Sequence, residues 1–278
     1  MALLRKIFSP LSINRLKWSV ERYFMHNFFL YFCAKKLFHI FPFLLPHERD
    51  YFGLKLLTKD ADGLFLDVGA NDGVSALSFR RINSSYSILS LEPNPLHLKS
   101  LERVRKRIQK FDYRLCAASD QPGSLTLSMP TYKGIPNHSG AFCDPEQRLV
   151  FEAAFPTKIA SRLQYVKQTV PAIRIDDLNL SPTIVKIDSE GHDLRVIRGM
   201  ERTILRHHPI LMVENNPALV GAICELLADW GYRVLEYDAK ENRLLPYSGG
   251  RTRNLFFIPL ETVVSVAGDT TNNVGHTC

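Results

Sequence analysis

Short apolar runs alternate with longer amphipathic segments from about residue 60 onward, and this pattern constrains the fold more than any other feature of the sequence. Apolar runs of about four to eight residues suit strands buried on both faces, and the segments between them are long enough for helices. Strands joined by crossover helices build a parallel sheet. The pattern therefore predicts a doubly wound α/β fold with a mainly parallel, seven-stranded sheet.

The expected elements follow one another in the order that such a fold needs. Parallel strands are expected at residues 63–68, 86–91, 112–118, 183–187 and 210–213, and a closing antiparallel pair at 232–237 and 254–259. Helices are expected at residues 74–81, 95–109, 193–206 and 218–230. An insertion at about residues 124–171, rich in proline, glycine, serine and aromatic residues, is where we expect substrate selection.

The basic residues are unevenly distributed along the chain. Of 35 basic and 28 acidic residues, seven basic and one acidic lie in residues 1–47, which leaves 28 and 27 for the remainder. The main domain is therefore close to neutral and has no basic face that could follow a nucleic-acid backbone. We expect no nucleic-acid partner.

Three segments are expected: an N-terminal helical extension at residues 1–50, a catalytic domain at 51–265 and a flexible tail at 266–278. The longest uncharged stretch of the extension, residues 23–34, has 12 residues, and a membrane span needs about 20. Its aromatic and basic residues fit either a helical cap or homodimer contact, or a helix at the inner face of a membrane. Five cysteines without a metal-binding spacing favour a cytoplasmic protein with free thiols.

A glycine-containing turn follows the first expected strand, with the sequence DVGANDG at residues 67–73. Gly69 and Gly73 allow the backbone to turn sharply and to approach a ligand closely. Glu92 ends the second expected strand, where a carboxylate can accept hydrogen bonds from ribose hydroxyls. The missing GxGxxG spacing argues against a nicotinamide oxidoreductase. The acid at position 67 fits a cationic ligand without phosphates, such as S-adenosylmethionine.

Four segments in order, FLDVGANDGVSALSF, LEPNP, IVKIDSEGHDLRVIRGM and HPILMVEN, closely resemble the FkbM family of methyltransferases over about residues 60–215. The resemblance implies a class I methyltransferase fold, S-adenosylmethionine as methyl donor, and commonly O-methylation of a sugar, glycolipid or natural product. Together with the turn it gives the following expected cofactor-binding residues: Asp67, Gly69, Ala70, Asn71, Gly73, Ser75, Glu92, Pro93, Asn94, Ala118, Ser119 and Asp120.

The fourth expected strand delivers Lys186, Asp188, Glu190 and His192 to the sheet edge where ligands bind in open α/β folds. Methyl transfer to a hydroxyl needs alignment and a proton acceptor. We expect Asp188 to position substrate or cofactor and Glu190 or His192 to act as the base. Alternatively, Glu190 and His192 only cap the following helix.

Substrate contacts are expected from the fifth strand and from the insertion: Tyr132, His138, Phe142, Glu214 and Asn215. Asp188, Glu214 and Asn215 are also oxygen ligands that could hold Mg²⁺, although a metal is not expected. The expected partner is a small-molecule or glycan acceptor. A non-catalytic, membrane-associated protein on the same fold is the alternative.

Overall fold

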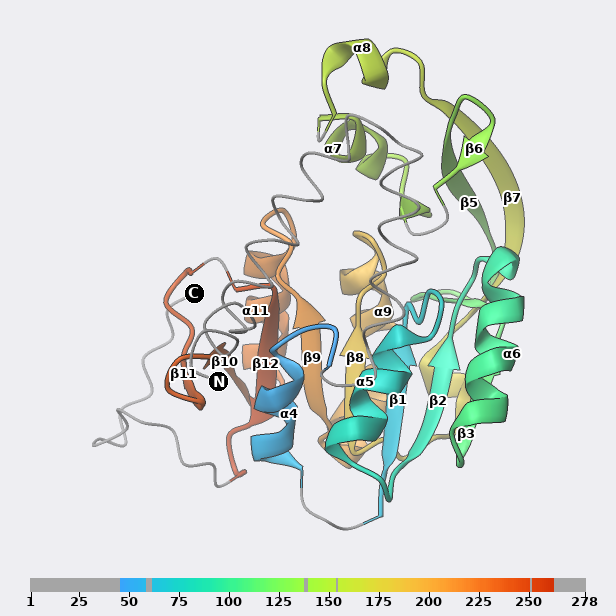
Figure 1. Ribbon diagram of the computed structural model, residues 1–278. Helices are drawn as coiled ribbons and strands as arrows, with labels where there is room; N and C mark the ends of the chain where they lie inside the picture. The colour runs from blue at the N-terminus through green and yellow to red at the C-terminus, as the bar shows by residue number, and fades with distance from the viewer. Residues whose placement is uncertain (1–45, 59–61, 138–139, 154, 251, 263–278) are drawn as a thin grey trace, which may run out of the picture.

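A central sheet of eight strands forms the middle layer of the computed structural model, which describes residues 46–58, 62–137, 140–153, 155–250 and 252–262 (Figure 1). Its strands lie in the order β11-β10-β12-β9-β8-β1-β2-β3. The bounds are β1 (Leu64–Val68), β2 (Ser87–Leu91), β3 (Phe111–Arg114), β8 (Ile184–Ile187), β9 (Ile210–Glu214), β10 (Tyr232–Asp238), β11 (Arg243–Pro246) and β12 (Asn254–Pro259).

Five strands, from β9 through β8, β1 and β2 to β3, pair in parallel, and β12, β10 and β11 add an antiparallel edge. This confirms the doubly wound α/β fold and the closing antiparallel pair. The expected count of seven strands was wrong, because β11 extends the edge beyond β10. Its RLLP sequence has one buried side chain, Leu244, so it lacks the apolar run that marks the other strands.

Helices cover both faces of the sheet, and the sheet separates the hydrophobic core into two clusters, one on each face. On β1, Phe65 packs on one face, whereas Leu66 and Val68 pack on the other, as the two-residue period of a strand requires. The first face is covered by α4 (Tyr51–Leu57), α5 (Val74–Ile82) and α6 (Leu98–Arg107), and the second by α9 (Asp193–Arg198), α10 (Glu201–His207) and α11 (Val220–Asp229). By the same alternation, Asp67 and Lys186 point toward the face covered by α4 and α5.

Three expected elements are divided in the structure. The strand expected at 112–118 is β3 plus β4 (Ala117–Ala118), and β4 belongs to a second sheet. The helix expected at 95–109 is a 3-10 turn, η2 (Pro95–His97), followed by α6. The helix expected at 193–206 breaks at Gly199 into α9 and α10. A Cβ there would lie 1.9 Å from the Ser119 carbonyl oxygen, so the chain passes too closely for any other residue.

The insertion folds into a second, four-stranded sheet in the order β4-β7-β5-β6. It contains β5 (Gly123–Tyr132), β6 (Ile135–Pro136), α7 (Gln147–Ala153), α8 (Thr157–Ala160) and β7 (Gln164–Ile173). Figure 1 shows β5 and β7 extending past the main sheet and carrying α7 and α8 above its carboxyl edge. We call residues 123–173 the arm.

The expected N-terminal extension lies almost entirely outside the described residues, which begin at residue 46, and so do the expected tail and His138. The cap, dimer and membrane-surface interpretations of residues 1–45 therefore stay predictions. Of the helices that the structure describes, none is both long and apolar enough to cross a bilayer.

Candidate active site

The turn after β1 has the backbone geometry that its glycines predict. Gly69, Asn71 and Gly73 have φ angles of 80°, 52° and 85°, a region that favours glycine and asparagine. A Cβ at Gly69 would lie 1.7 Å from the carbonyl oxygen of Asp188, so the ends of β1 and β8 touch there through bare backbone. The buried Ala70 continues the turn, and its N–H donates to the Leu91 carbonyl at 3.2 Å.

Asp67 is fully buried beneath this turn. Its Oδ2 accepts hydrogen bonds from the Ser75 hydroxyl at 2.5 Å and from the Ser90 hydroxyl at 2.9 Å. Its Oδ1 has no hydrogen-bond partner among the described residues. A buried carboxylate oxygen without a partner is costly, and a donor supplied by a bound ligand or by water would satisfy it.

Glu92 lies at the end of β2, next to the same turn. Its two oxygens accept the backbone N–H groups of Asn71 and Asn94, each at 2.7 Å. Burial raises the pKa of Glu92 to about 7, although both hydrogen bonds lower it. Pro93 and the buried Asn94 continue the chain away from the edge, and the Asn94 side chain accepts the Leu96 N–H at 3.1 Å.

The last of the segments expected at the cofactor, Ala118 to Asp120, contacts the loop after β8 and the helix that follows it. The Ser119 hydroxyl lies 3.0 Å from Nε2 of His192, and Asp120 forms an ion pair with Arg195 at 3.6 Å. Ala118 is buried in β4. The structure thus brings Ser119, expected near the cofactor, into contact with His192, expected in the reaction. Burial lowers the pKa of His192, and the Arg195 charge acts in the same direction, so its ring is neutral at pH 7.

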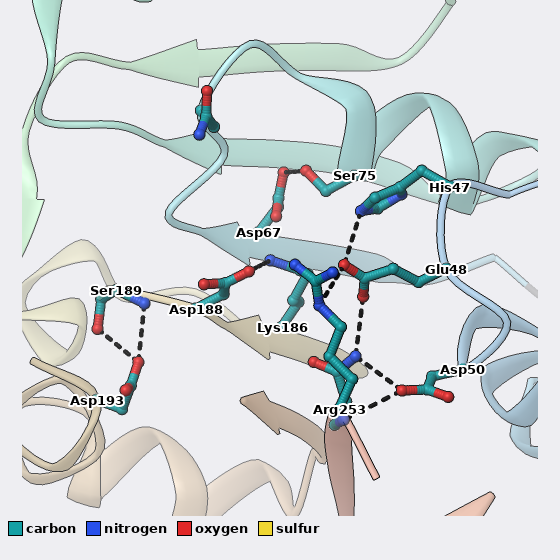
Figure 2. A network of polar contacts seen from close by, with 12 residues as sticks. His47, Glu48, Asp50, Asp67, Ser75, Lys186, Asp188, Ser189, Asp193 and Arg253 are labelled. Atoms are coloured by element: carbon teal, nitrogen blue, oxygen red, sulfur yellow. Dashed lines mark hydrogen bonds and ion pairs between the residues drawn. The ribbon is translucent and has the colours of Figure 1, made fainter. Parts of the chain in front are cut away.

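Lys186 does not reach the sheet edge, contrary to the expectation. It is 2% exposed, because the pleat of β8 directs it under the segment that precedes α4. Its ammonium donates to Oδ2 of Asp188 at 3.1 Å (Figure 2). Burial opposes its charge, but Asp188, Asp67 and Glu48 outweigh burial and raise the pKa of Lys186. Lys186 is therefore a buried cation that holds Asp188, whose own side chain is partly exposed.

Acidic side chains gather around Asp188 at the edge. Burial raises the pKa of Glu214 to about 9, and the charges of Asp188, Glu190 and Asp193 add to that increase. Burial and these charges therefore both favour the protonated form of Glu214. Asp193 is fully buried, and its Oδ1 accepts the N–H and hydroxyl of Ser189, at 2.8 and 2.7 Å. Glu190 is exposed, with a φ of 51°.

The other expected substrate residues occupy different surroundings. The Asn215 amide donates to the carbonyls of Gly250 and Thr252 at 3.3 and 3.1 Å, so it is tied to a neighbouring loop. Tyr132 lies in β5, and Phe142 is buried inside the arm against Phe151 and Tyr165. The arm contacts the site through Gln147 of α7, which lies against Gly191, and through Met129 of β5, whose sulfur accepts from the Asn94 amide at 4.0 Å.

Sequence reasoning missed a buried polar cluster formed by the two ends of the described chain. Glu48 accepts hydrogen bonds from Arg253 Nε at 2.9 Å and Asn254 Nδ2 at 2.8 Å, and Asp50 also accepts from Asn254 Nδ2, at 2.9 Å. Figure 2 shows this cluster beside Lys186 and Asp188. Its only sequence signal is the HERD segment before the first strand, because its partners lie more than 200 residues away.

The proposed metal ligands do not form a recognisable metal centre among the residues with described positions. No group of three or more His, Cys, Asp or Glu side chains there is arranged to hold a metal ion. Asp188 is paired with Lys186, and the amide of Asn215 is used by backbone carbonyls.

A model of the methyltransferase FkbM domain family matches residues 67–234, which is more than half of the chain. This protein belongs to the FkbM methyltransferase family. The match includes the glycine turn, Glu92 and the loop after β8, and it excludes Glu48, Asp50, Arg253 and Asn254.

Individual methyltransferases, from this family and from others, share less than a third of their residues with this chain over the matched regions. Hexuronic acid methyltransferase AglP of Haloferax volcanii is 29% identical over 171 residues, which cover 58% of this chain and 59% of that protein. The methyltransferase FkbM of Methylobacillus flagellatus KT is 18% identical, with a TM-score of 0.48, over 86% of this chain and 53% of its own. Human methyltransferase-like protein 13, solved with SAH, is 11% identical, with a TM-score of 0.39 over 77% and 82% of the two chains.

Proposed function

We propose that this protein is an S-adenosylmethionine-dependent O-methyltransferase that acts on a hydroxyl of a sugar or glycan. The observation that carries the proposal is the pair of buried acids, Asp67 and Glu92, around a glycine turn that meets the backbone of Asp188. This arrangement joins a place for a cationic nucleoside to a polar edge where an acceptor can lie. Membership of the FkbM family supports the reaction class.

The residues of the turn fit the methyl donor. The Glu92 oxygens each accept one backbone N–H and retain lone pairs for ribose hydroxyls. The unsatisfied Oδ1 of Asp67 supports an amino group, or a water that bridges to one, near the turn. When bound, S-adenosylmethionine supplies an electrophilic methyl group. Ser119 and Asp120 follow β4 at the side where we propose that the adenine lies.

At the reaction edge, Asp188 has the role of orienting the acceptor hydroxyl, because Lys186 holds its carboxylate in place at 3.1 Å. We assign the base to Glu190 rather than His192. Glu190 is exposed at the edge, whereas the His192 ring is buried, contacts Ser119 and has a solvent-inaccessible Nδ1. Glu190 would accept the proton of the acceptor hydroxyl as its oxygen takes the methyl group, which S-adenosylmethionine would supply from its sulfonium, leaving S-adenosylhomocysteine.

A sugar acceptor is supported by the similarity to a hexuronic acid methyltransferase. The arm lies above the edge and reaches Gly191 through Gln147, whose amide suits hydroxyl groups. Because Asp188 pairs with a lysine, and the described His, Cys, Asp and Glu residues form no group arranged to hold a metal ion, we also propose that transfer does not require magnesium. Activity that is unchanged by EDTA would agree with this, and restoration by Mg²⁺ after chelation would refute it.

The function is tested with methyl-labelled S-adenosylmethionine and a panel of uronic acids, neutral hexosides, phenols and amines. We expect label in methyl ethers of the sugars, and at least a hundredfold loss of kcat in Glu190→Gln with little change in cofactor binding. His192→Gln is the matched variant and should retain more activity. Transfer to amines alone, or a larger loss in His192→Gln, would contradict the assignment.

A further inference from the structure

The Glu48 cluster stands next to the reaction edge but comes from outside the segment that matches the family. Glu48 is 7% exposed and precedes α4, while Arg253 immediately precedes β12 and Asn254 is its first residue, in the antiparallel edge of the sheet. Two polar contacts to Glu48, from Arg253 and Asn254, and two from Asn254 to Asp50 join the two segments. Such contacts fix the two chain segments together, but they do not by themselves require a carboxylate that also faces Lys186.

Glu48 lies in the same polar cluster as Lys186, as Figure 2 shows, and the two side chains influence each other's charge. The three carboxylates that most strongly favour the charged ammonium of Lys186 are those of Asp188, Asp67 and Glu48. Lys186 in turn is one of the cations that stabilise the charge of Glu48, after His47 and Arg253. Burial raises the pKa of the Tyr51 hydroxyl, and the charges of Asp67, Glu48 and Asp188 raise it further. This hydroxyl has no hydrogen-bond partner among the described residues. The charges of Lys186, Asp188, Asp67 and Glu48 therefore influence one another around the same buried lysine.

We propose that Glu48 is a positioning residue that offsets the charges of Lys186 and Arg253, and thereby leaves the negative charge of Asp188 and Asp67 available to the cationic methyl donor. Without Glu48, the ammonium of Lys186 keeps the stabilising carboxylates of Asp188 and Asp67 but loses the third, and the guanidinium of Arg253 loses its ion pair with Glu48. The edge then becomes more positive. Inside a protein such charge differences act over several ångströms with little screening.

The proposal rests on the proposed function and predicts a specific preference. S-adenosylmethionine carries a sulfonium and has one more positive charge than S-adenosylhomocysteine, which is otherwise nearly the same shape. A residue that only holds the fold affects both ligands equally. A residue that tunes the charge of the edge affects the ratio of their affinities. This ratio separates the two roles.

The experiment is calorimetric titration of the full-length protein with each of the two compounds. In Glu48→Gln, we expect the affinity for S-adenosylmethionine to fall about fivefold or more relative to that for S-adenosylhomocysteine. Glu48→Asp should restore much of the ratio. Asp50→Asn is the matched control, because Asp50 shares the Asn254 hydrogen bonds but is not among the three strongest carboxylates on Lys186, and its ratio should match wild type.

Arg253→Gln provides a second variant if Glu48→Gln does not fold. Its side chain is more than half exposed, so the change is tolerable, and it removes a positive charge from the same cluster. We expect the ratio to move in the opposite direction, toward S-adenosylmethionine. Equal weakening of both ligands in Glu48→Gln, or an unchanged ratio in Arg253→Gln, would overturn the proposal. Wild-type protein that binds neither compound would instead refute the proposed function.

Discussion

Two buried glutamates on the carboxyl side of the sheet, Glu92 and Glu48, are almost equally shielded from water, at 6% and 7% exposure, yet their pKa values move in opposite directions. Burial raises the pKa of Glu92 to about 7, because only backbone N–H groups compensate. Burial also acts on Glu48, but His47, Arg253 and Lys186 overcome it and lower the pKa. We call the proposed cofactor side of the edge, with Asp67, the glycine turn and Glu92, the cofactor half, and the proposed acceptor side, with Lys186, Asp188 and Glu48, the reaction half. Among the described residues, backbone N–H groups favour the charge of Glu92 in the first half, and basic side chains favour the charge of Glu48 in the second.

The two halves also differ in how the chain builds them. Glu92 is held by residues 21 and 2 positions away, whereas Glu48 and Asp50 are held by residues more than 200 positions away. The cofactor half is a local structure that one βαβ unit can form. The reaction half forms only when the segment before α4, with Glu48 and Asp50, contacts Arg253 and Asn254 at the start of β12. A ligand that supplies donors to Glu92 and Asp67 fits the half that lacks them.

The largest effect is expected where the two halves touch. Gly69→Ala places a Cβ 1.7 Å from the Asp188 carbonyl oxygen at a φ of +80°, so β1 and β8 must separate. We expect a loss of at least about 4 kcal/mol in the free energy of unfolding, measured in urea, or failure to fold. Loss of both ligand sites should accompany it.

Gly134→Ala is the matched control for this change. Its φ of +77° is nearly the same, but a Cβ there meets nothing within 4 Å. We expect it to cost about 1–2 kcal/mol from backbone conformation alone. Similar losses in the two variants would show that the halves are not in close backbone contact at Gly69.

A smaller effect distinguishes the two glutamates by pH. Because the pKa of Glu92 is raised from 4.5 to about 7, its contribution to stability is present below pH 4.5 and is lost as the pH rises through about 7. The loss is on the order of 3 kcal/mol at most. Glu92→Gln should remove this decline, which urea unfolding at several pH values measures.

Glu48 has the opposite sign. Its pKa is lowered, so its contribution is present above its ordinary pKa of 4.5 and is lost as the pH falls through the folded-state value. Glu48→Gln should therefore lower stability at neutral pH and flatten the acid side of the profile. If both variants changed the same side of the profile, the contrast between the two halves would be wrong.

The geometry of the cofactor half was predictable from the sequence because its information is local. An apolar strand, a glycine turn and an acid at the end of the next strand are read within about 30 residues, and the structure places Asp67, Gly69 and Glu92 together. It did not predict that Lys186 is buried, because this depends on α4 covering that face. The pairing of Asn254 with Glu48 and Asp50 has no periodic signal.

The arm shows a similar limit. Its proline, glycine and aromatic content indicated a functional insertion, but not the antiparallel pairing of β5 with β7, because most side chains of β7 are exposed and leave that strand without a clear alternation of apolar and polar residues. Phe142 was expected near the acceptor and lies in the arm's interior. Gln147, which lies against Gly191, is an ordinary surface residue in sequence.

The central claim, that the acids around the glycine turn hold S-adenosylmethionine, is tested most directly by calorimetry of the wild type and Glu92→Ala. We predict binding to the wild type and at least a tenfold weaker affinity in the variant, with circular dichroism showing that both are folded. Glu102→Ala, which removes a partly buried acid of α6 that pairs with Arg105 and Tyr113 outside the turn, is the control and should bind as the wild type does. A folded wild type that does not bind, or a Glu92→Ala variant with unchanged affinity, would contradict the account.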